Sequence, residues 1–253
     1  MTAGDTDEIT EDVLLGGRVR LLQPATGYRA ATDPVLMAAA APATGAIDAL
    51  DLGCGVGAAS LCLAARAPEI TVHGLEVQEA YANLARRNAE MNSAAFTVHT
   101  GDLRDMPRAL KELTFDIVML NPPWHAPEAL ASPDPGRDLA NRRQGVMLEI
   151  WLTAALSRLR PGGWLMVIQR IEALPEILGS LAHRTGDIAV LPLAARVGRD
   201  AKRMIVKARK GSRGPFRLAA PLIMHAGASH VSDGDDFTDQ ARAILRDGAA
   251  LDF

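Results

Sequence analysis

The 253-residue sequence has little cysteine and no long hydrophobic segment. Its two cysteines, Cys54 and Cys62, cannot form the disulfide framework of a small secreted protein and suit a reducing cytoplasm. Apolar runs such as 117–120 and 164–168 are far shorter than the roughly 20 residues that cross a bilayer. The acidic, polar start lacks the basic and apolar regions of a secretory signal. We therefore expect a cytoplasmic globular protein without a membrane segment. Because His and acidic residues are not clustered at ligand spacing, we expect no metal site.

Charge is unevenly distributed along the chain, although the formal net charge is only −3. Residues 1–12 carry five acids and no base, whereas residues 196–217 carry nine Lys or Arg and a single acid, Asp200. A basic segment of this kind indicates an anionic partner. The alternative is a solvated hairpin rim without a partner.

Strand-length apolar runs alternate with helical periodicity between about residue 47 and residue 208. This pattern predicts βα units that wind a mainly parallel sheet. Thr32 or Asp33 is expected to cap a helix before this region, and Asp235 or Asp236 to cap a last helix after it. The expected strands cover 47–52, 70–76, 95–100, 115–120 and 163–169, and the expected helices between them cover 78–91 and 147–159.

A glycine-rich loop, "DLGCGVG" at 51–57, joins the first of these strands to a helix. Gly53, Gly55 and Gly57 let the backbone turn sharply and approach a ligand in front of the helix N-terminus. The spacing is G-x-G-x-G, which differs from the G-x-G-x-x-G of dinucleotide sites. The loop alone therefore indicates a ligand site without naming the ligand.

Acidic residues follow the next two strands. Glu76 ends the second strand and could accept hydrogen bonds from both hydroxyls of a ribose, or it could be a surface residue. Asp102 lies just past the third strand and could accept from the amino group of adenine, or it could cap the next helix. Because ligands of open α/β sheets bind at the carboxyl ends of the strands, the loop and the two acids together predict a nucleoside site.

The segment Asn121-Pro122-Pro123-Trp124 follows the fourth strand. Proline cannot donate to a sheet ladder, so this segment could be a strand terminator with a packing Trp. A chemical interpretation is also available. An amino nitrogen conjugated with a ring is a poor nucleophile until it becomes pyramidal. The Asn oxygen and a carbonyl of the Pro step could accept its two N–H bonds and hold it in line for attack. Trp124 could stack on the base, which is worth roughly 1–3 kcal/mol in nucleic-acid binders.

Together these motifs resemble the class I S-adenosylmethionine-dependent methyltransferases. The loop 51–57 resembles their motif I, Glu76 their ribose-binding acid and Asp102 their adenine-binding acid. The "NPPW" segment resembles the motif of enzymes that methylate planar amino groups. The resemblance implies an α/β, Rossmann-like fold with a mainly parallel seven-stranded sheet, helices on both faces and an antiparallel last strand.

The lead-in at 16–40, a basic strand at 202–211 and a terminal helix at 236–245 are similar to the bacterial tRNA (adenine-N6)-methyltransferase family, grouped with "methyltransferase small" domains. This chain departs from that family at Ala31, usually Gly, and at Trp124, more often Tyr or Phe. The implied organisation is an acidic disordered tail (1–13), a lead-in and helix covering the cofactor site (14–45), and the methyltransferase domain (46–253).

The resemblance implies an enzyme that transfers methyl from S-adenosylmethionine, giving S-adenosylhomocysteine, to N6 of an adenine in RNA, in particular tRNA near the anticodon. No metal, membrane or obligate protein partner is expected. The residues implied in catalysis are Asn121, Pro122, Pro123 and Trp124. Those implied in cofactor binding are Thr32, Asp33, Asp51, Gly53, Cys54, Gly55, Gly57, Glu76, Val77, Asp102, Leu103 and Asn121. Those implied in RNA binding are Trp124, Arg137, Arg142, Arg143, Arg203 and Lys207.

Two other functions remain open on the sequence. A protein glutamine-N5 methyltransferase acting on a translation factor has a similar motif, because a carboxamide nitrogen has the same delocalised lone pair. The lead-in, the basic segment and the lack of a helical N-terminal domain disfavour it. A non-catalytic cofactor-binding RNA protein is disfavoured because it would have no need of Asn121, Pro122 and Pro123.

Overall fold

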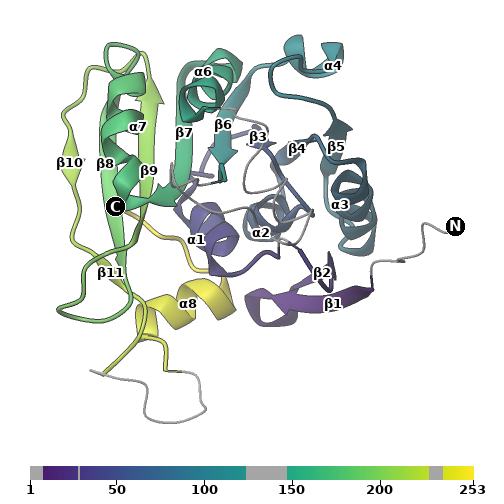
Figure 1. The fold of residues 1–253 in the computed structure, drawn as a ribbon, viewed down its shortest axis with the longest axis horizontal. Helices are drawn as coiled ribbons and strands as arrows, with labels where there is room; N and C mark the ends of the chain where they lie inside the picture. Colours follow the sequence, from purple (N-terminus) through teal and green to yellow (C-terminus); the bar gives the residue numbers. More distant parts are fainter. Residues whose placement is uncertain (1–7, 28, 124–146, 228–235) are drawn as a thin grey trace, which may run out of the picture.

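A mixed β-sheet forms the centre of the computed structural model, which describes residues 8–27, 29–123, 147–227 and 236–253 (Figure 1). The strand order is β10-β8-β9-β7-β6-β3-β4-β5, and β11 also pairs with β8. The first five strands in chain order, β3 to β7, run parallel, and β9 is antiparallel to both β7 and β8. The strands are β3 (Asp48–Leu52), β4 (Thr71–Glu76), β5 (Phe96–Thr100), β6 (Phe115–Leu120), β7 (Leu159–Arg170), β8 (Thr185–Ala194), β9 (Arg203–Lys210), β10 (Arg217–Leu218) and β11 (Leu222–Ile223).

This arrangement confirms the predicted Rossmann-like α/β class. Among the described residues, the sheet has seven strands of five or more residues and two strands of two residues. Strand β8 was not predicted from the sequence, because Gly186 and Pro192 weaken its strand pattern. The antiparallel strand β9 is not the last in the chain, because the short β10 and β11 follow it.

Helices cover both faces of the sheet, and each face has its own hydrophobic core. The alternation of side chains along β7 shows this, because Met166 and Ile168 belong to one core and Leu165 and Val167 to the other. No helix among the described residues is long and apolar enough to span a bilayer. One face carries α1 (Thr32–Ala40), α2 (Ala58–Arg66), α3 (Glu79–Met91) and α8 (Asp239–Asp247), and the other carries α4 (Arg108–Lys111), α6 (Leu148–Arg158) and α7 (Leu174–Leu181).

An N-terminal hairpin corrects the predicted boundary of the acidic tail. Strand β1 (Ile9–Leu14) pairs antiparallel with β2 (Val19–Pro24) through a turn at Leu15–Gly17, so residues 9–13 belong to a sheet. The two acidic residues of β1 are consecutive, and both form ion pairs, Glu11 with Arg20 and Asp12 with Arg29. A net charge in the segment therefore did not prevent a strand. Residues 1–7 of the predicted tail lie outside the described ranges.

Two asparagines of α3 attach this hairpin to the domain. The Asn88 side chain accepts from the Leu22 amide (2.8 Å) and donates to the Leu22 carbonyl (3.0 Å). Asn92, one helical turn later, does the same with Arg20 at 2.9 and 2.7 Å. Residues four apart on a helix lie about as far apart as residues two apart on a strand. The two amides therefore bond the free edge of β2 as a neighbouring strand would.

The caps of the first and last helices differ from the prediction. Ala31, which forms no side-chain capping bond, precedes α1, and neither Thr32 nor Asp33 acts as its cap. Thr238 caps α8, and its hydroxyl accepts from the Ala241 amide at 3.2 Å. Gly248 ends α8 in a left-handed conformation, which glycine adopts without strain.

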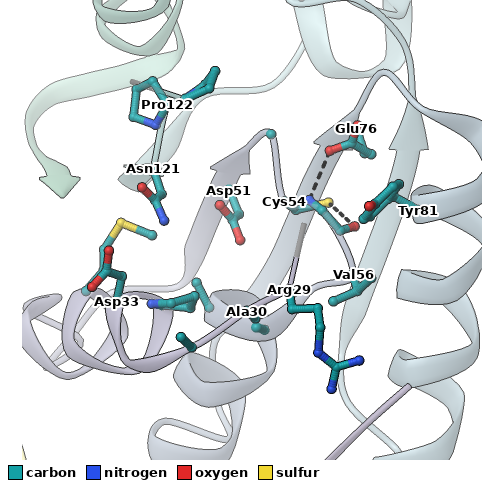
Figure 2. A pocket seen from close by; sticks show the side chains of 18 of the residues that line it. Arg29, Ala30, Asp33, Asp51, Cys54, Val56, Glu76, Tyr81, Asn121 and Pro122 are labelled. Atoms are coloured by element: carbon teal, nitrogen blue, oxygen red, sulfur yellow. Dashed lines mark hydrogen bonds between the residues drawn. The ribbon is translucent and has the colours of Figure 1, made fainter. Parts of the chain in front are cut away.

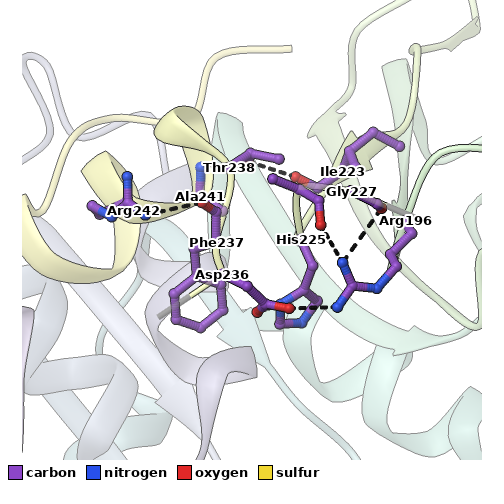
Figure 3. A network of polar contacts seen from close by, with 10 residues as sticks. Arg196, Ile223, His225, Gly227, Asp236, Phe237, Thr238, Ala241 and Arg242 are labelled. Carbon is purple, nitrogen blue, oxygen red and sulfur yellow. Dashed lines mark hydrogen bonds and ion pairs between the residues drawn. The ribbon is translucent and has the colours of Figure 1, made fainter. Parts of the chain in front are cut away.

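The acidic residues predicted to cap α8 have another position. Asp235 lies outside the described residues, and Asp236 bridges Arg196 and His225 (Figure 3). The His225 Nδ1 lies 2.6 Å from the Asp236 carboxylate, and the His225 ring stacks on Phe237. This network connects the approach to α8 with the segment that follows β8.

Candidate active site

A cavity of about 310 Å³ lies at the carboxyl edge of the parallel strands (Figure 2). Strand β3 has β4 on one side and β6 on the other. The strands β3, β4 and β5 therefore follow one another toward one edge of the sheet, and β6 and β7 follow toward the other edge, so that the two directions diverge between β3 and β6. Open α/β sheets bind ligands in the crevice at such a point. Residues at or just beyond the ends of β3, β4, β6 and β7 line the cavity, together with the start of α1 and Arg203 at the start of β9.

The floor of the cavity, defined as residues 51–57 with Glu76, is held by main-chain hydrogen bonds. The amides of Gly53 and Cys54 both donate to the Leu75 carbonyl, at 2.7 and 3.1 Å. Gly53 and Gly55 have positive φ, which glycine adopts without strain. Both line the cavity, and their predicted contact with the cofactor stays a prediction.

Gly57 is required for packing. It has a φ of +89° and precedes α2, and a Cβ placed on it would lie 2.6 Å from the Phe96 ring on β5. Gly57 is not among the residues that line the cavity. Its predicted contact with the cofactor therefore stays a prediction, whereas its close approach to Phe96 is a property of the fold.

Glu76 is only 2% exposed and its carboxylate faces the cavity. The Gly55 amide donates to Oε2 at 3.0 Å, and the Gln78 amide donates to Oε1 at 2.8 Å. An ionised carboxylate has about four acceptor positions, so one remains on each oxygen. The side chain is thus fixed in place and can still accept from two hydroxyl groups of a ligand.

Asp51 is a second buried carboxylate at the floor, 3% exposed. Burial raises the pKa of Asp51 to about 7, and the nearby charge of Glu76 adds to the effect, while a hydrogen bond from the Ser60 hydroxyl (2.8 Å) opposes it. Burial likewise raises the pKa of the Cys54 thiol well above its ordinary value. Two buried carboxylates facing one cavity favour a ligand with positive charge and hydroxyl groups. S-adenosylmethionine, with its sulfonium, ammonium and ribose, fits this set of groups.

Asn121, Pro122 and Pro123 follow β6 and line the same cavity, opposite the start of α1 (Figure 2). The Pro122 carbonyl accepts a hydrogen bond of 2.8 Å from Nε2 of Gln169 at the end of β7. The main-chain oxygen at this step is therefore held by a side chain from the neighbouring strand. Trp124, the fourth residue of the motif, lies outside the described residues.

The wall of the cavity, defined as residues 29–33, is held by side chains of the hairpin. Arg29 donates to the Thr10 hydroxyl and to the Asp12 carboxylate. Gln23 is buried, donates to the same carboxylate at 3.0 Å and accepts from the Ala30 amide at 2.7 Å. The hairpin thus fixes the segment that leads into α1.

Arginines surround the mouth of the cavity. Arg29, Arg170 and Arg203 all line it, and each pairs with a carboxylate: Arg29 with Asp12, Arg203 with Asp33, and Arg170 with Glu172 at 3.5 Å. The buried acids Asp51 and Glu76 therefore lie inside the cavity, whereas the more exposed arginines lie at its rim with their own acidic partners. Asp33, predicted to contact the cofactor, lines the cavity, and its neighbour Thr32 does not.

The structure separates Lys207 from Arg203. Lys207 lies four residues further along β9, and its Nζ is 4.3 Å from the centre of the Phe253 ring. Burial lowers the pKa of Lys207, and it does not line the cavity. The two predicted RNA contacts are thus on one strand but in different environments, and their roles stay predictions.

Three predicted cofactor residues are not among those lining the cavity. The Asp102 carboxylate accepts from the Arg104 amide (2.8 Å) and side chain (3.0 Å). Leu103 packs on the core under α4, α6 and α7. Val77 is 48% exposed. Their part in binding adenine stays a prediction. The predicted RNA contacts Arg137, Arg142 and Arg143 lie outside the described residues.

The structure adds residues that sequence reasoning missed. Gln169 and Arg170 end β7 at the cavity, and Gln78 and Tyr81 approach it from the start of α3. A polar residue at the end of the apolar run 163–169 was a usable signal for Gln169, because the other site residues also end strands. Over the described ranges, no three His, Cys, Asp or Glu side chains converge where they could hold a metal ion.

The doubly wound sheet, the glycine-rich floor and the acid at the end of β4 define an S-adenosylmethionine-dependent methyltransferase. A family model described as "Methyltransferase small domain" matches residues 33–189, and the chain belongs to this family. The resemblance read from the motifs is therefore confirmed.

Individual relatives agree with this assignment. The tRNA1(Val) (adenine(37)-N6)-methyltransferase of Porphyromonas gingivalis (strain ATCC BAA-308 / W83) is 28% identical over 223 residues, which are 83% of this chain and 86% of that protein. An enzyme of the same name from Yersinia pestis (strain Pestoides F) is 31% identical over 151 residues, 58% of each protein. A solved structure, titled as a predicted O-methyltransferase from Agrobacterium tumefaciens, is 30% identical with a TM-score of 0.71 and covers 87% of this chain and 99% of that one.

Proposed function

We propose that this methyltransferase acts on the exocyclic N6 amino group of an adenine in RNA, in particular in tRNA near the anticodon. The observation that carries the proposal is the position of the Asn121–Pro122 step at the cavity, beside a floor suited to the cofactor. The names of the relatives, tRNA1(Val) (adenine(37)-N6)-methyltransferase, support the same acceptor.

The step from residues to reaction is one of positioning. S-adenosylmethionine, when bound, supplies a methyl group on positively charged sulfur. The Asn121 side-chain oxygen and the Pro122 carbonyl would accept the two N–H bonds of the amine, which favours a pyramidal nitrogen with its lone pair directed at the methyl group. The nitrogen gains the methyl group and then releases one proton to water. Neither oxygen has to act as a base.

This geometry supports nitrogen over oxygen as the acceptor atom. The structural relative from Agrobacterium tumefaciens has a title that names a predicted O-methyltransferase. A hydroxyl acceptor offers a single hydrogen, so one acceptor group would suffice for it. The pairing of an amide oxygen with a main-chain carbonyl suits a group that carries two hydrogens.

The charges around the cavity support RNA over a protein glutamine. A glutamine side chain is neutral and needs no cationic rim, whereas a nucleotide brings phosphate groups. Arg29, Arg170 and Arg203 lie at the cavity mouth, where phosphates beside a flipped adenine would pass. Each of these arginines already pairs with a carboxylate, Arg29 with Asp12, Arg203 with Asp33 and Arg170 with Glu172, so phosphate would have to compete with these acids or join them.

The test is transfer of labelled methyl from S-adenosylmethionine to RNA or protein taken from cells that lack the enzyme. We expect label that nuclease removes and protease does not, recovered after digestion as N6-methyladenosine. The Asn121→Ala variant, which keeps the cofactor floor, serves as the control and should label nothing. Protease-sensitive label on glutamine, or label on a hydroxyl oxygen of RNA, would contradict the proposal.

A further inference from the structure

Gln169 is a buried polar residue that the proposed reaction does not yet explain. It is 6% exposed, lies next to the end of β7 and lines the cavity. Its Nε2 donates to the Pro122 carbonyl at 2.8 Å, and its Oε1 accepts from the Arg170 amide at 2.8 Å. Because one partner is an acceptor and the other a donor, the orientation of the side-chain amide is fixed.

The location of this bond follows from the prolines. Leu120 of β6 is opposite Val167 of β7, and continuing that register puts Pro122 opposite Gln169. Pro122 and Pro123 have no N–H group, so this part of the chain cannot be held through the donors that a strand ladder uses. The Gln169 side chain supplies a hydrogen bond where the main-chain ladder ends, and so fixes the chain beyond β6.

The bond also determines which part of the carbonyl is left for a ligand. A carbonyl oxygen has two lone pairs, and Gln169 uses one of them. A substrate N–H must then approach along the other. The direction of the second hydrogen bond is thereby set before a substrate arrives, which is the condition for aligning a weak nucleophile.

We propose that Gln169 is a positioning residue for methyl transfer, which aims the Pro122 carbonyl at one hydrogen of the acceptor amine. The proposal rests on the proposed function, because it assigns Pro122 a contact with the substrate. Gln169 itself touches the carbonyl and not the reacting nitrogen. Its loss should therefore lower kcat and change the affinity for the cofactor little.

The test compares Gln169→Ala and Gln169→Glu with the wild-type enzyme on whichever RNA the wild type labels. We expect Gln169→Ala to lower kcat about 10- to 100-fold, the range that a small misalignment costs, with cofactor affinity within about threefold of wild type. An ionised Glu has no hydrogen to donate and would repel the carbonyl, whereas a protonated Glu can donate one hydrogen bond. Burial raises the pKa of such a carboxyl group. Relative to wild type, the kcat of Gln169→Glu should recover as the pH falls from about 8.5 to about 6, and that of Gln169→Ala should not.

Thr185→Val is the matched control. The Thr185 hydroxyl donates to the Leu181 carbonyl at 3.1 Å, and Thr185 pairs with Lys210 at the end of β9 that is distant from Arg203 and the cavity. This variant removes a side-chain bond to a carbonyl, as Gln169→Ala does, and should lower the melting temperature while leaving kcat within about twofold.

The outcomes separate this proposal from the proposed function. If the wild-type enzyme labels protein and not RNA, the proposed acceptor is wrong, and the same variants can be assayed on that protein. If Gln169→Ala retains wild-type kcat, or if Gln169→Ala and Gln169→Glu have the same pH profile, the positioning role is wrong. Loss of cofactor affinity together with kcat would also contradict it, because Gln169 would then only support the fold.

Discussion

The floor and the wall of the cavity are held by different kinds of contact. The floor, residues 51–57 with Glu76, depends on main-chain amides of adjacent strands and loops, such as the bonds from Gly53 and Cys54 to the Leu75 carbonyl. The wall, residues 29–33, depends on side chains of the hairpin, chiefly Asp12 and Gln23. The floor is held chiefly by contacts within the sheet and its loops, whereas the wall requires the hairpin to be in place.

The floor and the wall also differ in their relation to the family model. The family model matches residues 33–189, which include the floor and begin at the last residue of the wall. The hairpin lies before that range and reaches the floor through Asn88, whose Nδ2 donates to the Val56 carbonyl at 2.9 Å. We infer that the floor supplies the chemistry of cofactor binding and the hairpin closes one side of the cavity. Substitutions in the floor should therefore have the larger effects.

The largest effect is expected for Glu76→Ala. This change removes both acceptors proposed for the ribose and leaves the half-buried amides of Gly55 and Gln78 without their partners. We expect the dissociation constant for S-adenosylmethionine, measured by calorimetry, to rise about 100-fold or more. Glu90→Ala, which removes an exposed carboxylate from α3, should leave it unchanged. Near wild-type affinity in Glu76→Ala would mean that the floor does not bind the ribose.

The parts of this site that could be predicted from sequence are those with a local pattern. Glu76 was identified because it ends a strand at a fixed distance after the glycine loop, and Asn121 because the prolines after it rule out a continued strand. The β8 and β1 strands were missed, since Gly186 and Pro192 weaken the first and acidic residues the second. Their stability comes from pairing with distant strands, which single-sequence patterns do not show.

Contacts between distant segments account for the other misses. Gln169 acts on a carbonyl that is 47 residues away in the chain, and Arg203 pairs with Asp33 at a separation of 170 residues. Arg203 was predicted to bind RNA because of its charge alone, and the structure shows that the carboxylate of Asp33 in α1 already contacts it. The residue types were informative, but their partners could be known only from the fold.

A smaller, pH-dependent effect is expected at Asp51. With its pKa raised to about 7 by burial, Asp51 is mostly neutral near pH 6 and ionised near pH 8. A cationic ligand favours the ionised form, so affinity for S-adenosylmethionine should increase about tenfold between these two pH values. Asp51→Asn should weaken binding and remove this dependence, as calorimetry at the two pH values would show.

The same group predicts the pH dependence of stability without ligand. Because the folded-state pKa is above that of the unfolded chain, the folded protein holds an extra proton between the two values. The contribution of Asp51 to stability therefore falls as the pH rises from about 4 to about 7. The melting temperature of Asp51→Asn should fall less over this range than that of wild type. Parallel melting curves would mean that Asp51 is not the buried acid described here.

The smallest effect is expected in the wall, for Gln23→Leu. Leucine fills a similar volume but cannot bond Asp12 or the Ala30 amide, so the segment 29–33 would be held less firmly. We expect a threefold to tenfold rise in KM for the acceptor and the cofactor, with kcat within about twofold, because the reacting groups are on the other side of the cavity. Arg20→Gln breaks the exposed ion pair with Glu11 on the same hairpin and serves as the control, with no expected change in KM. A loss of kcat in Gln23→Leu as large as that in Asn121→Ala would mean that the wall takes part in the reaction and does not merely close the cavity.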